Sequence, residues 1–253
     1  MEVVFFFIIQ WYLSLFCQSF FHHRYSAHRV CTMSPFWEKF FFVASFITQG
    51  SSYISAYAYG IMHRLHHVHT DTKEDPHSPK NSSNVFKMMW DTKVSYNHIF
   101  FEEIPIEEKY RKQLPQWHGF EKIAHNWFTR FVWIGLYTSF WVYFATEWWH
   151  WIFLPMTIAI GSLQGAVVNY FSHVIGYRNF DLNNTSTNLI PFFDLFLWGE
   201  SYHNNHHKYA GRPSHAIKWF EFDPMFPAMK VMDFLGIIRL RSKYNTKEEN
   251  PVF

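Results

Sequence analysis

The feature that most constrains the fold of this chain is an uncharged apolar run near its start. Residues 3–21 read VVFFFIIQWYLSLFCQSFF and contain no Asp, Glu, Lys or Arg. A helix over this run, at about 1.5 Å per residue, is about 28 Å long, close to the hydrocarbon thickness of a bilayer. The run has no basic segment before it and no small-residue cleavage site after it, unlike a signal peptide. It therefore predicts a membrane-spanning helix.

Two later segments are also long and apolar enough to be predicted as spans. Residues 127–146 carry one charge, Arg130, and residues 151–171 carry none. The turn between them, at 147–150, has no Lys or Arg, whereas the long polar stretches, 61–126 and 172–253, contain many. Because positive residues favour the inner side, we expect this turn and the N-terminus to lie outside and the polar stretches to lie in the cytoplasm.

The composition excludes several other classes of protein. Apolar residues make up 49% of the chain and charged residues 17%, which excludes a disordered chain. The net charge is +2 and no basic stripe is present, so nothing indicates a nucleic-acid partner. Two cysteines cannot build a disulfide framework.

Nine of the seventeen histidines fall into four groups beside apolar segments. Residues three and four apart share a helix face, so the members of His63-x-x-His66-His67 point one way, as do those of the similar box at 203–207. The first group is spaced i, i+5, about 140° apart on an α-helix. Its two histidines can serve one metal only where the helix ends or loosens. The groups are His23 and His28; His63, His66 and His67; Asn169 and His173; and His203, His206 and His207.

Imidazole suits iron, zinc, copper and nickel, and nine histidines match two metals with four or five ligands each. The scarcity of cysteine disfavours structural zinc. The first two groups can meet only if residues 40–60, which are apolar but contain Ser, Thr, Gln and Gly, do not cross the membrane. We therefore expect 40–60 to be interfacial or re-entrant. The predicted fold is an all-α integral membrane protein with about three to four transmembrane helices and a cytoplasmic helical cap carrying the histidine boxes.

These motifs resemble those of the membrane fatty acyl desaturases of the Δ9 acyl-CoA (stearoyl-CoA) type. They are His-Arg-x-x-x-His-Arg at 23–29, His-Arg-x-His-His at 63–67, Asn-x-x-x-His at 169–173 and His-Asn-Asn-His-His at 203–207. Asp-Pro-His-Ser-Pro at 75–79 and Trp-Phe-Glu-Phe-Asp-Pro at 219–224 match as well. The resemblance covers roughly residues 12–240, and the form of the last box resembles bacterial members.

The resemblance implies one desaturase domain over residues 1–253 with a di-iron centre. By position, one iron takes His23, His28, His63, His67 and His206. The other takes His66, His173, His203 and His207, with Asn169 acting through water. Four further residues near the boxes are candidates for orienting the ligands, namely Asp71, Asp75, His77 and Glu200. His22 and His215 are predicted to be ordinary polar residues.

The resemblance also implies the reaction and its partners. Two irons, Fe2+ in the reduced form, use O2 and two electrons to place a cis double bond, at Δ9, in a long saturated acyl chain. The substrate is a long-chain fatty acyl thioester or a lipid, held among membrane lipids. The electron donor is a separate protein such as ferredoxin or cytochrome b5, since no haem-binding or flavin-binding segment is recognisable. The expected location is the bacterial inner membrane, with the active site on the cytoplasmic face.

Two departures and two alternatives stay open. Family members usually have a two-span hairpin before the first box, whereas this chain has room for one span. Ile61 and Met62 stand where animal members place an Arg-Asp pair at the coenzyme A headgroup, which leaves acyl carrier protein or a phospholipid as carrier. The alternatives are a di-iron membrane hydroxylase or ketolase, and a non-enzymatic histidine-lined metal-binding membrane protein. The His-x4-His first box favours a desaturase, and spans nearly free of ionisable residues disfavour a transporter.

Overall fold

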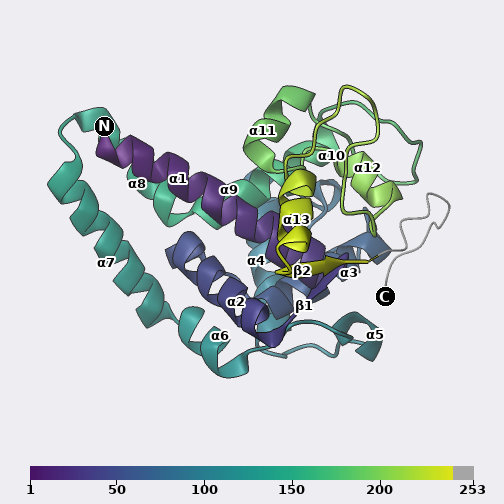
Figure 1. The fold of residues 1–253 in the computed structure, drawn as a ribbon, viewed down its shortest axis with the longest axis horizontal. Helices are drawn as coiled ribbons and strands as arrows, with labels where there is room; N and C mark the ends of the chain where they lie inside the picture. Colours follow the sequence, from purple (N-terminus) through teal and green to yellow (C-terminus); the bar gives the residue numbers. More distant parts are fainter. Residues whose placement is uncertain (242–253) are drawn as a thin grey trace.

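The computed structural model describes residues 1–241, and a single long N-terminal helix runs through it (Figure 1). Helix α1 (Glu2–Cys17) continues directly into η1 (Gln18–Ala27), which is a π-helix. In the described residues this combined helix is long and apolar enough to cross a membrane. A second segment, Trp148–Val174, reaches that length only if its two parts, which meet at a bend of 77°, count as one span.

The two later predicted spans therefore differ from a pair of straight transmembrane helices. Residues 127–146 form α7 (Trp127–Phe144), whose many Trp, Tyr, Ser and Thr residues lower its hydropathy, and it is not among the candidate spans. The segment 151–171 is divided at Ala159. Residues 148–174 form η4 (Trp148–Ile152), α8 (Phe153–Ile158), α9 (Ile160–Ala166), η5 (Val167–Phe171) and α10 (Ser172–Val174). The predicted number of spans stays a prediction.

The start of α1 and the turn after α7 lie at the same end of the molecule (Figure 1). The rings of Phe6 and Phe140 are 4.7 Å apart, and those of Phe7 and Phe153 are 5.1 Å apart. Aromatic pairs at these separations pack favourably. The histidine boxes lie toward the opposite end of α1, in η1 and beyond.

Within residues 35–55 the chain reverses its direction, and the turn lies beside the middle of α1. Helix α2 (Pro35–Gln49) begins after the N-cap Ser34, and the turn η2 (Gly50–Ser52) leads into α3 (Ala56–His69), which carries the second box. The turn lies against Tyr137, whose hydroxyl accepts a 2.8 Å hydrogen bond from Gln10 in α1. The chain thus reverses near the middle of α1 and α7, and the first two boxes lie at one end.

Polar groups of this turn bond the backbone at the bend of the broken helix. The Ser51 hydroxyl donates to the carbonyl of Ile158 at 2.7 Å, and the Ser52 hydroxyl accepts from the amide of Gly161 at 2.9 Å. Both backbone groups flank Ala159, where the α-helical ladder is interrupted. Two serines of the segment that we expected not to span thus bond the backbone groups of the bend.

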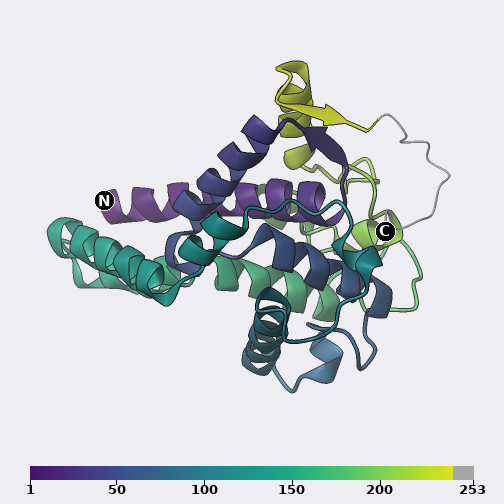
Figure 2. The same cartoon turned by 90° about the horizontal axis from the view of Figure 1, so that it is seen from below.

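The remaining elements cover the histidine end. A short antiparallel ladder, β1 (Cys31–Met33) with β2 (Ile238–Leu240), ties the exit of the first box to the C-terminal region. Figure 2 shows this ladder and α13 on the same side as the start of α2. The other elements are η3 (Pro79–Asn81), α4 (Val85–Phe100), α5 (Glu108–Arg111), α6 (His118–Ala124), η6 (Pro191–Phe193), α11 (Asp194–Leu197), α12 (His203–Lys208) and α13 (Met225–Phe234).

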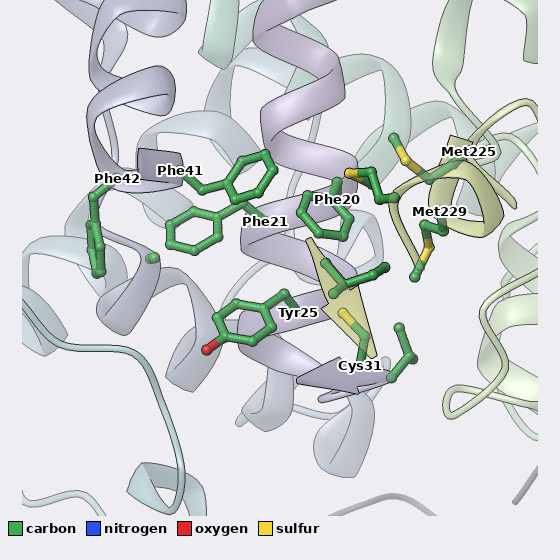
Figure 3. Packing of buried hydrophobic residues seen from close by; sticks show 12 residues of the cluster. Phe20, Phe21, Tyr25, Cys31, Phe41, Phe42, Met225 and Met229 are labelled. Carbon is green, nitrogen blue, oxygen red and sulfur yellow. The ribbon is translucent and has the colours of Figure 1, made fainter. Parts of the chain in front are cut away.

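An aromatic and methionine core holds η1 in place (Figure 3). Phe20 and Phe21 are fully buried, and Phe21 packs edge-on against Phe42 of α2 with ring centroids 5.0 Å apart. Met225 and Met229 of α13 close the other side of the cluster. Each buried aromatic side chain contributes about 2–3 kcal/mol of hydrophobic stabilisation, so this core can stabilise the rarer π-helical geometry beside it.

Gly50 provides a test of the mid-helix turn. Its φ is +53°, and an added Cβ would overlap the Tyr137 hydroxyl. We expect Gly50→Ala to lower the free energy of unfolding by about 2–4 kcal/mol, since strain and overpacking add. The measurement is denaturant unfolding of the detergent-solubilised protein. Gly135→Ala is the matched control, because nothing lies within 4 Å of its added Cβ. Equal stability of the two variants would contradict the described turn.

Candidate metal centre

The π-helix η1 allows the two histidines of the first box, spaced i, i+5, to lie on one face. In a π-helix each amide bonds the carbonyl five residues earlier, so residues i and i+5 share a face. The amide of His28 donates to the carbonyl of His23 at 3.1 Å, which continues this pattern at the end of η1. The two imidazoles, which would diverge on an α-helix, therefore point to one place.

The second box lies on α3, directly beside η1. Ser55 caps the start of α3, and the hydroxyl of Ser26 in η1 donates to the carbonyl of Ala56 at 2.7 Å. The Arg64 guanidinium donates to the carbonyl of Ala27 at 2.9 Å and to that of Ser26 at 3.2 Å. These are carbonyls at the C-terminal end of η1, where backbone acceptors lack helical donors. The arginine of the second box thus completes the helix of the first.

The nine histidines form two groups. Within each group, the ligand nitrogens all lie within 4.8 Å of one another. The first group combines η1, α3 and α12, and the second combines α3, α10 and α12. These are the two sets that the resemblance implied. The groups are His23, His28, His63, His67 and His206, and His66, His173, His203 and His207.

Within each group the imidazoles face one another through Nε2. The Nε2–Nε2 distances are 3.0 Å from His23 to His206 and 2.8 Å from His28 to His63. In the second group they are 3.0 Å from His203 to His173 and 3.2 Å from His66 to His207. Two ligands about 2.1 Å from a metal and at right angles to each other are separated by about 3.0 Å. The spacing therefore fits shared metal ligation.

Protonation supports the same conclusion. Burial, together with neighbouring imidazoles, lowers the pKa of every ligand histidine on α3 and α12 well below its usual value, so these rings are neutral. For the rings whose Nδ1 faces an acceptor, the single proton of the neutral ring is assigned to Nδ1, and Nε2 keeps its lone pair. Converging lone pairs repel unless a cation lies between them, so the donor set fits a pair of metal ions.

In each group, a carboxylate lies beside Nδ1 of one ring, away from the Nε2 atom that faces the other rings. Glu200 lies 2.6 Å from Nδ1 of His23, and Asp75 lies 2.9 Å from Nδ1 of His66. Burial raises the pKa of Asp75 to about 7, but both of its oxygens already accept backbone amides, those of Asp71 and His77. Its oxygens therefore act as acceptors for the imidazole. Contacts of this kind orient metal-binding histidines and raise their basicity.

Asp71 reaches the second group through an intermediate residue. Its carboxylate accepts the Thr185 amide at 2.5 Å, and the Thr185 hydroxyl lies 3.1 Å from Nδ1 of His173. The sequence analysis named Asp71 but not Thr185, which lies twelve residues after His173 in a stretch without a motif. Only the folded chain brings Thr185 to the ring.

His77 packs on a ligand without hydrogen bonding to it. Its ring stacks on His66 with centroids 4.1 Å apart, and its side chain is buried. Burial lowers the pKa of His77 to about 3, so it presents a neutral ring. His77 therefore limits the tilt of His66 by contact.

Asn169 and His22 lie beside the groups in different surroundings. Asn169, in η5 one turn before His173, is partly exposed. His22 is buried, and its ring nitrogens lie 3.2 Å from the carbonyl of Cys17 and 3.0 Å from that of Ile54. His22 is therefore directed to backbone carbonyls and away from the groups.

The sequence analysis missed a buried ion-pair network behind the first group. Arg24 is fully buried and bonds Glu200 at 2.5 Å and Asp223 at 2.9 Å. Burial raises the pKa of Glu200, but the contacts of its carboxylate with Arg24 and His23 outweigh burial and hold that pKa well below the usual value. His215, predicted to be ordinary, is buried with its ring 4.6 Å from that of His206. The motif at 219–224 contains Asp223 and could have signalled this contact.

The comparisons with known proteins agree with the motifs. A family model described as fatty acid desaturase matches residues 2–230. The chain belongs to the fatty acid desaturase family. Membership makes it an oxidoreductase that acts on acyl lipids and confirms the resemblance stated from the sequence.

Curated relatives are similar over most of their length. The chain is 28% identical to Delta-9 desaturase-like 3 protein of Arabidopsis thaliana, covering 87% of this chain and 70% of the relative. It is 26% identical to sn-1 stearoyl-lipid 9-desaturase of Anabaena variabilis, covering 85% and 74%. It is 27% identical to hex-5-enoyl-[acyl-carrier protein] acetylenase of Moorena producens (strain JHB), covering 90% and 73%. The names of the last two relatives give different carriers, a lipid and an acyl-carrier protein, so similarity at this level leaves the carrier to be tested.

Removing one supporting carboxylate tests the second group separately. We expect Asp75→Asn to lower metal affinity at the second group by about 10–100-fold, because His66 loses the acceptor that fixes its ring. Iron titration of the metal-free protein, followed by iron quantification, measures the change. Asp91→Asn, at a partly exposed carboxylate paired with Lys87, is the control and should bind iron as the parent protein does. Unchanged affinity in Asp75→Asn would show that Asp75 does not support a ligand.

Proposed function

We propose that this protein is an O2-dependent di-iron desaturase that places a cis double bond, at Δ9, in a long saturated acyl chain. The observation that carries the proposal is the convergence of nine imidazoles, from four distant stretches, into two groups facing through Nε2. All-nitrogen ligand sets of this kind suit iron. Family membership supplies the acyl-lipid substrate class.

In this proposal each group holds one iron. The first iron takes the five imidazoles of η1, α3 and α12, and the second takes the four of α3, α10 and α12. Asn169 completes the second set through a water molecule. Its place in η5, one turn from His173, is compatible with that role.

Bound iron would supply the redox chemistry: with O2, two electrons and two protons, two adjacent C–H bonds break, and a double bond and two waters form. The chain's own residues provide position and exclusion of water. Glu200 and Asp75 hold one ligand ring in each group, so the donor atoms are preorganised. Seven of the nine histidines are buried, and His67 and His207 are partly buried, so the groups keep solvent away from the reacting methylenes.

We further propose an acyl lipid as the carrier of the chain that is desaturated. Ile61 and Met62 are buried in an apolar cluster with Tyr57, Ile99 and other residues, so these positions present no charge to a headgroup. Relatives named stearoyl-lipid and acyl-lipid desaturases favour the same carrier class. Supplying purified protein with stearoyl-phospholipid, stearoyl-coenzyme A or stearoyl-acyl carrier protein distinguishes the three carriers.

The proposed orientation puts the histidine end at the cytoplasmic face of a bacterial inner membrane. The charge asymmetry between the polar stretches and the 147–150 turn supports this orientation. A separate donor protein, such as ferredoxin or cytochrome b5, would then deliver electrons at the same face.

The central test removes one ligand of the second group. We expect His203→Ala to abolish desaturation and to lose much of the bound iron, because three imidazoles remain where four converged. The measurement is expression in a host lacking unsaturated fatty acids, with mass spectrometry that locates double bonds. His98→Ala is the matched control, since His98 is exposed on α4 and pairs with Glu103. Retained desaturation in His203→Ala would overturn the proposed centre.

The same measurement separates the reaction types. A desaturated product is two hydrogens lighter than the substrate, whereas a hydroxylated product is one oxygen heavier. Iron binding without any O2-dependent product would favour the non-enzymatic metal-binding alternative.

A further inference from the structure

We propose that residues 189–198, which we name the phenylalanine loop, insert into the bilayer hydrocarbon beside α1. The sequence analysis placed this segment in a cytoplasmic polar region. The inference rests on the proposed membrane-spanning position of α1, and its test separates the two. The loop contains η6 and α11 and leads directly to Glu200 and the last histidine box.

The loop is attached to the middle of α1. The Trp11 indole donates to the carbonyl of Phe196 at 3.1 Å, and the Trp198 indole donates to the carbonyl of Tyr12 at 3.2 Å. Leu189 and Leu197 pack with Leu15 in one buried cluster. Trp198 also packs on Phe16 with ring centroids 5.4 Å apart, and its carbonyl accepts from the Ser19 hydroxyl at 3.0 Å. These contacts fall on residues 11–19 of a helix that runs from residue 2 to residue 27.

This attachment sets the depth of the loop. Residues 11–19 begin about 14 Å from the start of α1, at about 1.5 Å per residue, and end about 12 Å before the end of η1. A helix that crosses a bilayer has its middle in the hydrocarbon region. A loop that is hydrogen bonded to this part of α1 through the Trp11 and Trp198 indoles therefore lies in the same region.

The outward face of the loop matches hydrocarbon. Its exposed side chains are large and apolar, with exposures from 42% to 66%. The one charged residue, Asp194, is buried, and its carboxylate accepts the amides of Gly199 at 3.0 Å and Ser201 at 3.2 Å. A face of this kind is unfavourable in water, because the free energy falls when apolar surface is removed from water. The exposed residues are Ile190, Phe192, Phe193, Leu195 and Phe196.

The backbone of the loop also meets the requirement of a membrane interior, where polar groups need internal partners. The amide of Leu189 donates to the carbonyl of Ser201 at 2.9 Å, and that of Phe193 donates to the carbonyl of Ile190 at 2.9 Å. The amide of Trp198 donates to the carbonyl of Asp194 at 3.1 Å. Helical turns and the two indoles thus satisfy much of the backbone locally.

Continuity with α1 favours lipid over a protein partner. α1 exposes Phe5, Ile9 and Leu13, which are side chains of the same kind. Hydrocarbon covers both surfaces without needing a complementary shape. Insertion would also anchor Glu200, which follows the loop directly and contacts His23.

Site-specific fluorescence tests the depth of the loop. A nitrobenzoxadiazole label is attached to Phe192→Cys, and the labelled protein is reconstituted in phosphatidylcholine vesicles. Phe5→Cys reports the exposed face of α1, and Asn183→Cys reports the histidine end, because nearby Thr185 bonds Asp71. The native Cys17 and Cys31 are buried, and labelling of the unsubstituted chain gives the background.

The expected result is that iodide quenches Phe192→Cys several-fold less than Asn183→Cys, while lipids spin-labelled on the acyl chain quench it as they quench Phe5→Cys. Iodide quenching at Phe192→Cys equal to that at Asn183→Cys, with Phe5→Cys protected, would overturn the inference and leave α1 in the membrane. Iodide quenching at all three positions would overturn the membrane position of α1 as well. Protection from both quenchers at Phe192→Cys would show that protein covers the loop, which also overturns lipid contact.

Discussion

Neutral imidazoles that present their lone pairs to one another are the constraint on which this structure depends. Nε2 atoms 2.8–3.2 Å apart, such as those of His28 and His63 or His66 and His207, gain nothing from each other without a cation. The arrangement persists because helices from four parts of the chain are packed firmly around it. The fold therefore holds repelling groups together, in an arrangement that fits the proposed pair of metal ions.

Two irregular features of the backbone make the convergence possible. The π-helix η1 turns His23 and His28 to one side, and the turn at Gly50 reverses the chain before it passes the middle of α1. Both are supported by side chains from elsewhere. Arg64 bonds the final carbonyls of η1, and the hydroxyls of Ser51 and Ser52 bond the backbone at the bend beside Ala159. Irregular helical geometry is often found at functional sites, where the surrounding packing can offset its cost.

Charge is organised in layers around the imidazoles. Glu200 and Asp75 touch the rings, and Arg24 with Asp223 stands behind Glu200. A buried arginine between two carboxylates is costly to dehydrate, and removing one partner would leave a charge unpaired. This coupling links the first box to the C-terminal motif at 219–224, far away in the sequence. The same region supplies α13, whose methionines close the core against η1.

Much of the site was predictable because the motifs are local: i, i+3 and i+4 spacing puts the histidines of α3 and α12 on one face without knowledge of the fold. The motifs identified the family, and the resemblance to it implied the same two groups of histidines that the structure brings together. Thr185, Arg24 and His215 were not predictable in the same way, since their contacts join segments separated by many residues.

The sequence by itself determined the kind of chemistry, the apolar N-terminal helix and the need for the first two boxes to meet. Only the tertiary structure decided how they meet, through a π-helix and a mid-helix turn, and it broke the predicted span 151–171 at Ala159. It also moved residues 189–198 from an expected polar region to the middle of α1. The physical reason is that residue type and spacing specify local geometry, whereas depth, bends and outer contacts depend on which distant surfaces pack together.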